Sequence, residues 1–557
     1  MSEGSEGTTA VVVGAGMGGL AAAIELAVAG RAVTVLERAA VPGGKVRPVS
    51  VAGRDVDGGP TVFTMKWVLE DLLARAGMRL DDYVTLRSAD ILARHWWDPG
   101  TGDRGTDGTG TGTGAPCATL DLFADPARSQ AAISAFASPQ DGAAFAEFSA
   151  RAARAFDTLR DPFMCAQQPS PPGLVLRVGL QNLRRMLEIK SFASLWSELA
   201  RTFSDPRLRQ LFGRYATYCG SSPYQAPATL MLVAHVEQAG VWYVDGGMHA
   251  LARALEEVAK TLGVTFRYGT DVQTINVAGG CVRSVTSAAG EEFKAGEVVF
   301  NGDANALARG LLGSATQRAV RPRSARQHAL SALATTCVAQ AHGPASLTHH
   351  NVFFSADYEN EFERIFRRSA LPTAPTTYVC AQDRAGVAGD RSAPRAEHPA
   401  ERFLLITNAP AHPDLNQQEI AACQAATNAL MTRCGLHLTD PATQAPVLAT
   451  GPQTGHARLT GPREFAALFP GSDGSLYGAA SHGWRASFTR PAAATPIAGL
   501  ALAGGTVHPG PGVPMAVLSG QLAATKLISD RASTRSSHRV VMPGGTATRL
   551  ATTGSSG

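Results

Sequence analysis

The chain has little charge and no clear excess of one sign. Only 17% of its 557 residues are charged, below the roughly 25% usual for soluble domains. Its 50 basic residues are nearly balanced by 46 acidic ones, which gives a formal net charge of +4. A nucleic-acid-binding protein carries a larger and clustered basic excess, so we expect no nucleic-acid partner. Apolar residues make up 45% of the chain, which excludes global disorder.

Closely spaced cysteines are also missing. The nearest two of the eight, Cys423 and Cys434, are eleven positions apart, so no spacing typical of zinc or iron–sulfur ligation occurs. Scattered thiols are typical of buried small side chains in a reducing compartment. The first residues, MSEGSEGTTA, lack the features of a signal peptide, and no segment has the composition of a membrane span. We therefore expect a cytoplasmic protein without a metal site.

The order of apolar runs predicts an α/β fold with a mixed α+β part. Short buried strands at 11–13 and 33–37 flank a helix of small residues at 16–29, which requires parallel pairing of the strands. Further strands are expected at 91–97, 118–124, 264–269, 272–278, 298–301 and 500–503. Further helices are expected at 67–76, after Met248, from Val513 and over much of 125–240.

A glycine-rich turn follows the first strand. The sequence GAGMGG at 14–19 is a G-x-G-x-x-G between a strand and a helix. Gly14 permits the tight turn, Gly16 lets backbone approach a pyrophosphate, and Gly19 lets the helix pack closely on the strand. Glu37, at the end of the second strand, can bind ribose hydroxyls and would repel a 2′-phosphate. Strand, helix, second strand and terminal acid agree, so the pattern predicts a dinucleotide site.

Two further segments favour FAD over a nicotinamide cofactor. Gly43-Gly44-Lys45 and Asp57-Gly58-Gly59-Pro60-Thr61 follow the second strand. A nicotinamide domain needs neither, whereas the longer FAD needs more small-residue backbone along its length. Near the other end, the strand at 500–503 leads through a Gly/Pro-rich turn into a helix. The N-terminus of that helix, aimed at the flavin, would stabilise its anionic reduced form.

Three stretches resemble a known family. They are VVVGAGMGGLAAAIELAVAGRAVTVLERAAVPGGKV, YVDGGMHALARAL and AGGTVHPGPGVPMAVLSGQLAA. These stretches are similar to the phytoene-desaturase-type carotenoid flavoproteins of the amine-oxidase-like FAD superfamily. Within that family, DGGPTVFTMKWVLEDLLARAG, ILARHWW and NVFFSADYENEF most resemble the 1-hydroxycarotenoid 3,4-desaturases (methoxyneurosporene dehydrogenases).

The resemblance implies a set of cofactor contacts and a division of the chain. FAD contacts are expected from it at Gly14, Gly16, Gly19, Glu37, Arg38, Lys45, Gly59, Val272 and Gly505. The glycine-rich segments after the second strand and the C-terminal turn add Gly44, Pro60, Thr61 and Val513. Residues 8–75, 240–305 and 495–530 are expected to form a Rossmann-like FAD-binding domain. Residues 76–239 and 306–494 are expected to form a substrate-binding domain with a mixed sheet and helices. We expect a flexible Thr/Gly-rich insertion at 98–116 and a disordered tail at 531–557.

The activity implied by the resemblance is desaturation of a carotenoid. It would introduce a C3–C4 double bond into a 1-hydroxycarotenoid, such as 1-hydroxyneurosporene or its methoxy derivative, in carotenoid biosynthesis. Flavin N5 accepts the hydride in such a reaction, so the protein mainly aligns the substrate. The alternatives are a phytoene or neurosporene desaturase of the same family, a reduced-flavin-dependent carotenoid isomerase, and a non-enzymatic prenyl-binding protein. Oxygen and a quinone remain alternatives for the terminal electron acceptor.

Few titratable residues stand out as catalytic, and the catalytic base is unassigned. His508, in the C-terminal turn, is a candidate, although a turn-stabilising role is favoured. A structural role is favoured for His349-His350 over metal binding, because no partner ligand is evident. Trp96-Trp97 either line an apolar tunnel or belong to the core.

One segment suits contact with a membrane surface, from which a carotenoid must arrive. Residues 171–196, PPGLVLRVGLQNLRRMLEIKSFASLW, combine leucines with four basic residues and one acid, Glu188. As a single amphipathic helix, they predict peripheral association with the inner membrane. A buried amphipathic helix with a solvated basic face is the alternative.

Overall fold

The computed structural model describes residues 9–98, 117–179, 192–324, 329–384, 399–448 and 455–538. The predicted Thr/Gly insertion, apart from Asp98, lies outside the described residues. The end of the predicted tail, from residue 539 onward, also lies outside them.

A five-stranded parallel sheet forms the first layer of the fold. Its strand order is β20-β13-β1-β2-β9, and every neighbouring pair is parallel. The strands are β1 (Thr9–Val13), β2 (Ala32–Leu36), β9 (Thr265–Arg267), β13 (Glu297–Phe300) and β20 (Leu500–Leu502). All four residues of β13 are buried, as expected for a strand covered on both faces. Segments from the start, middle and end of the chain therefore close one sheet.

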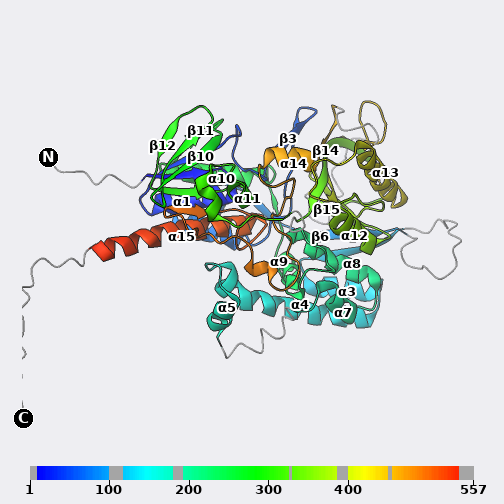
Figure 1. Ribbon diagram of the computed structural model, residues 1–557. Coiled ribbons are helices and arrows are strands. Elements are labelled where there is room, and N and C mark those ends of the chain that lie inside the picture. The colour runs from blue at the N-terminus through cyan, green and yellow to red at the C-terminus, as the bar shows by residue number, and fades with distance from the viewer. Residues whose placement is uncertain are drawn as a thin grey trace, which may run out of the picture.

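Helices cover one face of this sheet and a small antiparallel sheet covers the other (Figure 1). The helices are α1 (Met17–Val28), α2 (Trp67–Arg75), α10 (His249–Thr261) and α15 (Val513–His538). The antiparallel strands are β10 (Val272–Ala278), β11 (Cys281–Ser287) and β12 (Glu292–Lys294). Helices α1 and α15 pack closely, because a Cβ on Gly520 would lie 2.1 Å from the carbonyl oxygen of Gly18. Small residues in α1 therefore serve helix–helix packing.

An eight-stranded mixed sheet forms the second part. Its order is β18-β14-β17-β16-β15-β6-β7, with β19 paired to β14, and only the β15–β6 pair among these described strands is parallel. The strands are β6 (Ile91–Trp97), β7 (Ala118–Phe123), β14 (Ser331–His342), β15 (His350–Phe354), β16 (Thr377–Ala381), β17 (Glu401–Ala409), β18 (His437–Thr439) and β19 (Ala457–Thr460). The β15–β6 pair can be parallel because a long stretch of chain, including the helices between β7 and β14, separates the two strands.

Helices pack on this second sheet around an aromatic core that includes Trp97, Phe145, Phe212 and Phe354. The helices between β7 and β14 are α3 (Pro126–Phe136), α4 (Pro139–Leu159), α5 (Pro171–Val178), α7 (Leu195–Thr202), α8 (Pro206–Gly213), α9 (Leu232–Gln238) and α11 (Ala304–Ala308), besides α10. Those after β15 are α12 (Tyr358–Arg368), α13 (Gln417–Arg433) and α14 (Pro462–Leu468). A Ser or Asp side chain caps each of α3, α4, α5, α7 and α8 by accepting a backbone N–H bond. Local capping therefore sets where these helices begin.

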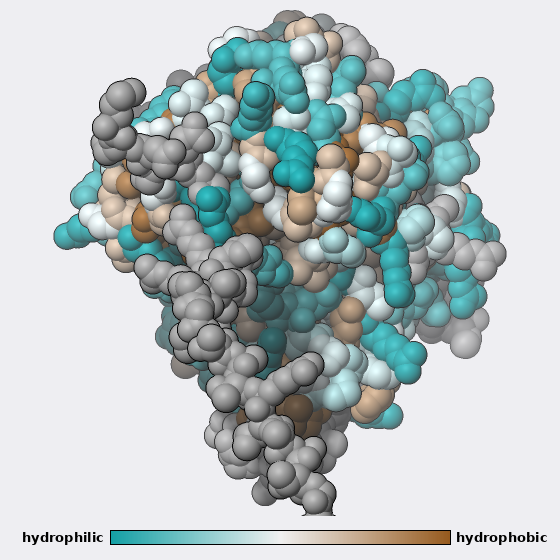
Figure 2. Space-filling model, turned by 60° about the vertical axis from the view of Figure 1, so that its left-hand side comes forward, coloured by the Kyte–Doolittle hydropathy of each residue, from teal (hydrophilic) through white to brown (hydrophobic). Residues whose placement is uncertain are grey.

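Two short strand pairs complete the sheets. β3 (Pro48–Val51) pairs with β4 (Arg54–Asp57), and β5 (Leu86–Ser88) pairs with β8 (Trp242–Val244), both antiparallel. The second pair joins the region after α2 to the start of α10. Figure 2 shows hydrophilic side chains predominating on one face of the molecule, with hydrophobic ones in small groups between them.

The structure corrects two of the predicted elements. Residues 171–196 do not form one helix, because α5 ends at Val178 and Gly179 follows with a φ of +82°. A new helix, α7, begins after the Ser194 cap, and residues 180–191 lie outside the described ranges. The predicted tail is also wrong at its start, because α15 continues to His538. Extending an existing helix costs little, since each added residue gains a backbone hydrogen bond.

Candidate functional site

A cavity of about 1040 Å³ lies between the two sheets. Val13, Leu36 and Phe300 line it from the carboxyl ends of β1, β2 and β13. Ala334 and Ile406 line it from strands β14 and β17 of the mixed sheet. Ligands of open α/β sheets bind at the carboxyl ends of the strands. The volume exceeds the roughly 300–1,000 Å³ of most small-molecule pockets, so it suits a dinucleotide together with part of a second molecule.

The first glycine turn forms one end of the cavity. Gly14 has a φ of +99°, and Gly16 is the extended residue before α1. A Cβ on Gly19 would lie 2.0 Å from the carbonyl oxygen of Gly14, so only glycine lets α1 approach the turn this closely. Gly14 and Gly16 line the cavity, whereas Gly19 acts in packing. No side chain among the described residues caps the N-terminus of α1, which leaves its first N–H groups available for an anion.

Glu37 is held against the glycine turn by two backbone hydrogen bonds. Its carboxylate oxygens accept from Ala15 N–H at 2.7 Å and from Ala39 N–H at 2.8 Å. Each oxygen keeps a lone pair for a ligand hydroxyl. Arg38 also lines the cavity, and its guanidinium donates to the carbonyl oxygens of Ala467 and Leu468. Arg38 therefore joins the end of β2 to the region of α14.

The loop after β2 folds over the first turn. Gly43 N–H donates to Ala15 O at 2.8 Å, and a Cβ on Gly59 would lie 1.9 Å from the carbonyl oxygen of Lys45. The Lys45 ammonium donates to the carbonyl oxygen of Leu476. Burial lowers the pKa of Lys45 to about 8, against the opposing effect of Asp303. Glycine segments and a lysine thus meet at the middle of the cavity.

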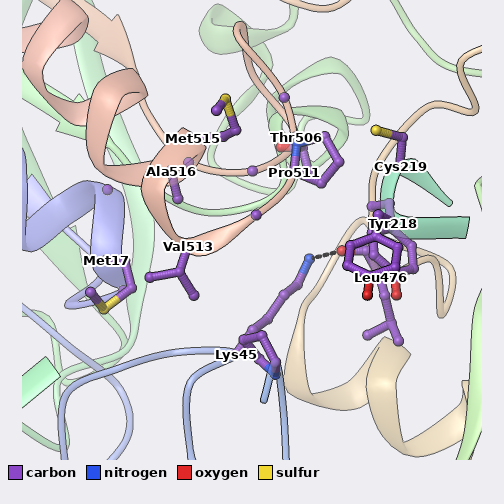
Figure 3. Close-up of a pocket in the computed structure, with 18 of the residues that line it drawn as sticks. Met17, Lys45, Tyr218, Cys219, Leu476, Thr506, Pro511, Val513, Met515 and Ala516 are labelled. Carbon is purple, nitrogen blue, oxygen red and sulfur yellow. Dashed lines mark hydrogen bonds between the residues drawn. The ribbon is translucent and has the colours of Figure 1, made fainter. Parts of the chain in front are cut away.

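The C-terminal turn brings the start of α15 to the same place. Met17, Val513 and Lys45 line this part of the cavity from α1, α15 and the loop after β2, and Figure 3 shows Lys45 directed at Leu476. Gly505 lines the cavity in the turn, and Val272 lines it at the start of β10. The N-terminus of α15 therefore presents the positive end of a long helix to the cavity.

The structure brings twelve of the thirteen predicted cofactor contacts to one cavity, Gly19 being the exception. Gly44, Pro60 and Thr61 complete that set. The sequence prediction missed Asn301, whose side-chain amide donates to Gly14 O at 3.2 Å and lines the cavity. Its position directly after the buried strand β13, at the carboxyl edge of a parallel sheet, was the available signal.

His508 does not line the cavity. Its Nε2 lies 2.9 Å from Phe163 O and 3.1 Å from Ala166 O, so the imidazole joins the C-terminal turn to the segment that follows α4. Burial lowers its pKa, which keeps the ring neutral. Trp96 and Trp97 lie in the core, where Trp97 donates to Gln210 at 2.8 Å and neither ring lines the cavity. These positions fit the turn-stabilising and core roles.

Two hydrogen-bonded networks contribute polar groups to the wall of the cavity. In one, Tyr218 Oη accepts from Arg214 at 2.9 Å and donates to Glu237 at 2.8 Å. Tyr215 also donates to Glu237, at 3.1 Å, so the buried Arg214–Glu237 ion pair is held by additional hydrogen bonds. The second network contains Thr61, Tyr378 and His350.

Cys380 lies beside His349 and His350. It is a third potential metal ligand that the sequence did not reveal. Potential ligand atoms of the three residues all lie within 4.8 Å of one another, and His349 Nε2 is 3.4 Å from Cys380 Sγ. Register across β15 and β16 places His350 opposite Cys380. Burial lowers the pKa of His349 to about 4 and raises that of Cys380 to about 12. The groups are therefore neutral, and a structural role remains a prediction.

Comparison with known proteins identifies the family. Residues 17–386 match the family described as flavin containing amine oxidoreductase. The chain belongs to this family. This flavoprotein is 45% identical over 547 residues to a protein named hydroxyneurosporene desaturase from Rubrivivax gelatinosus, covering 98% of both chains. It is 40% identical over 523 residues to one of the same name from Cereibacter sphaeroides, covering 94% of this chain and 98% of the relative.

Solved structures share the fold of this flavoprotein. An oxidoreductase from Methanosarcina mazei aligns with a TM-score of 0.54 at 16% identity, covering 93% of this chain and 100% of that one. The α/β fold with a mixed part is confirmed, and so is the resemblance to the carotenoid desaturases. The protein is an FAD-dependent oxidoreductase. Its uncapped α1 N-terminus and close-packed glycines, which leave no room for side chains, fit that cofactor.

Proposed function

We propose that the protein introduces a C3–C4 double bond into a 1-hydroxycarotenoid, such as 1-hydroxyneurosporene or its methoxy derivative, in carotenoid biosynthesis. The observation that carries this proposal is the 45% identity, over 98% of both chains, to a hydroxyneurosporene desaturase. The cavity supports it, because its wall continues from the glycine motifs to apolar side chains such as Leu174, Val175 and Phe488. A long uncharged polyene requires such a wall.

The reaction removes a hydride and a proton from adjacent carbons and leaves a new double bond between them. FAD, when bound, supplies the hydride acceptor at N5. The chain's own residues align the polyene in the apolar wall and exclude water from it. The N-terminus of α15 favours negative charge at the edge of the cavity that it faces. We propose that electrons then pass to oxygen or to a quinone.

Pigment spectra test this function. Purified protein is incubated with 1-hydroxyneurosporene and, separately, with phytoene, each under oxygen or with a quinone. We expect a red shift of one conjugated double bond with the hydroxylated substrate alone. Conversion of phytoene instead would favour the alternative desaturase. Geometric change without any gain of double bonds would favour an isomerase.

We also propose that the protein takes its substrate from a membrane surface as a peripheral protein of the inner membrane. None of the helices in the described ranges is long and apolar enough to cross a bilayer. Leu174 and Val175 of α5 line the cavity, while Leu176 on the same helix is 79% exposed. Phe192 also lines the cavity and is 82% exposed. Exposed apolar side chains beside the cavity suit insertion into a membrane interface.

Liposome pelleting tests the membrane proposal. Leu176→Glu and Phe192→Glu should each weaken binding about tenfold or more, because transferring such a side chain contributes roughly 1.5–3 kcal/mol. Val28→Glu is the matched control, since Val28 is 44% exposed at the end of α1 and does not line the cavity. Equal pelleting of all three variants and the unaltered protein would contradict the proposal.

A further inference from the structure

The oxygen at C1 of a 1-hydroxycarotenoid must lie close to the cofactor while C3 and C4 react. With single bonds of about 1.5 Å, that oxygen is about 3–4 Å from C3 and at most about 5 Å from C4. The reacting carbon must come within about 3.5 Å of the hydride acceptor. A protein group that binds the oxygen must therefore belong to the wall beside the cofactor, and not to a distant end of the cavity.

A short hydrogen-bonded chain occupies such a position. Thr61 Oγ1 lies 2.6 Å from Tyr378 Oη, and Tyr378 Oη lies 2.6 Å from His350 Nδ1. Thr61 follows Gly59, which is in close backbone contact with Lys45. Tyr378 comes from β16 and His350 from β15 of the mixed sheet. These hydrogen bonds therefore connect the cofactor-binding segment to the substrate part. Thr61 and Tyr378 both line the cavity.

Packing alone does not account for these three polar groups. His350 is 2% exposed, and its Nε2 has no hydrogen-bond partner within the described residues. Tyr378 remains partly exposed at the cavity although both neighbouring residues in β16 are fully buried. A phenylalanine at this position would avoid burying the hydroxyl. Polar groups that are buried at a cost beside an apolar cavity are typical of a specific ligand contact.

The direction of the hydrogen bonds in this chain is set by the tautomer of His350. With Nδ1 unprotonated, Thr61 donates to Tyr378 and Tyr378 donates to His350, so Thr61 Oγ1 keeps lone pairs that can accept from a substrate hydroxyl. With Nδ1 protonated, each bond reverses and the Thr61 hydroxyl can donate to an ether oxygen. Burial, with His349 and Arg214 nearby, lowers the pKa of His350, so the ring is neutral and either tautomer is available.

On the basis of the proposed function, we propose that Thr61, Tyr378 and His350 form a subsite for the oxygen at C1 of the carotenoid, which aligns C3 and C4 with the cofactor. One donor–acceptor direction of these hydrogen bonds suits a substrate hydroxyl, and the opposite direction suits a methoxy group. The network of Arg214, Tyr218 and Glu237 is less suited, because the Tyr218 hydroxyl already accepts from Arg214 and donates to Glu237. The subsite explains how a mostly apolar cavity can distinguish a hydroxylated end from a hydrocarbon end.

Binding without turnover tests the subsite. The flavin of the holoenzyme is chemically reduced under anaerobic conditions, and 1-hydroxyneurosporene and neurosporene are titrated separately by their absorption change. The unaltered protein should bind the hydroxylated carotenoid at least about tenfold more tightly, as expected for one well-placed hydrogen bond. Tyr378→Phe and Thr61→Val should abolish this preference. Thr61→Ser, which keeps the hydroxyl, should retain it.

Tyr243→Phe is the matched control. The Tyr243 ring lies 4.7 Å from the ring of His349, but Tyr243 does not line the cavity, so this variant should keep the preference. Flavin absorbance reports whether each variant retains FAD. If Thr61→Val loses FAD, Tyr378→Phe alone tests the subsite, because Tyr378 is not a predicted FAD contact. A preference that survives in Tyr378→Phe, or is absent from the unaltered protein, overturns the subsite. Failure of the oxidised enzyme to desaturate 1-hydroxyneurosporene instead contradicts the proposed function.

Discussion

Replacing Gly19 by alanine tests the packing that supports the cofactor turn. The added Cβ would lie 2.0 Å from the carbonyl oxygen of Gly14, whereas real Cβ contacts are essentially never under 3.0 Å. The two backbones must therefore separate by at least about 1 Å. Neither side yields easily, since β1 is paired with β2 and β13, and Gly18 of α1 packs against Gly520 of α15.

The expected cost of Gly19→Ala is about 1–3 kcal/mol in the free energy of unfolding, the range for overpacked sites. Movement of the turn also displaces the α1 N-terminus, so FAD affinity should fall about tenfold or more, tenfold being about 1.4 kcal/mol. Urea denaturation measures the first quantity and flavin titration of the cofactor-free protein the second.

Gly296→Ala is the matched control for this experiment. A Cβ at Gly296 meets nothing within 4 Å, and its φ lies outside the left-handed region, so stability and FAD affinity should remain unchanged. The reasoning is refuted if Gly19→Ala matches Gly296→Ala in both measurements, because the glycine would then have no packing role.

Three further predictions concern the charge and the metal-binding capacity of buried groups. Glu37→Ala leaves the N–H group of the fully buried Ala15 without its acceptor, at about 1–3 kcal/mol, and removes the carboxylate that lines the cavity. Flavin titration should therefore show about tenfold weaker binding, and unchanged affinity would contradict this. Burial raises the pKa of Glu361 to about 7, so the folded state holds a proton that the unfolded state loses near the ordinary pKa of 4.5. Stability should therefore fall as pH rises between these values, and Glu361→Gln should remove that fall in urea midpoints, whereas an identical pH profile would refute it. Elemental analysis should find far less than one zinc or copper per chain, and a full equivalent lost in His349→Ala would overturn the structural role of that histidine.

Local sequence patterns predicted several elements well. The strands at 91–97 and 272–278 have the predicted bounds, because each is an apolar stretch ended by a local turn signal. The helix at 171–196 was predicted wrongly, because amphipathic spacing alone took no account of Gly179 and the Ser194 cap. Gly179 ends one helix and Ser194 begins the next, and these local signals override the amphipathic spacing.

Other features were beyond any local pattern. The position of Asn301 after a buried strand indicates the edge of the sheet, but nothing in that stretch indicates that its amide contacts Gly14, 287 residues away. Cys380 joins His349 and His350 only through the antiparallel register of β15 and β16. Register is determined by the whole sheet and the cores that cover it, so a single segment does not reveal it.

The sequence by itself determined the cofactor and the family, because the glycines and the acid that bind a dinucleotide lie within one short strand-turn-helix-strand unit. Only the tertiary structure decided what surrounds the rest of the cavity. Thr61 meets Tyr378 across 317 residues, and Lys45 meets Leu476 across 431. Hydrogen bonds between residues so far apart in the sequence form when the parts of the fold built on the two sheets pack together. The periodicity of a segment does not predict that packing.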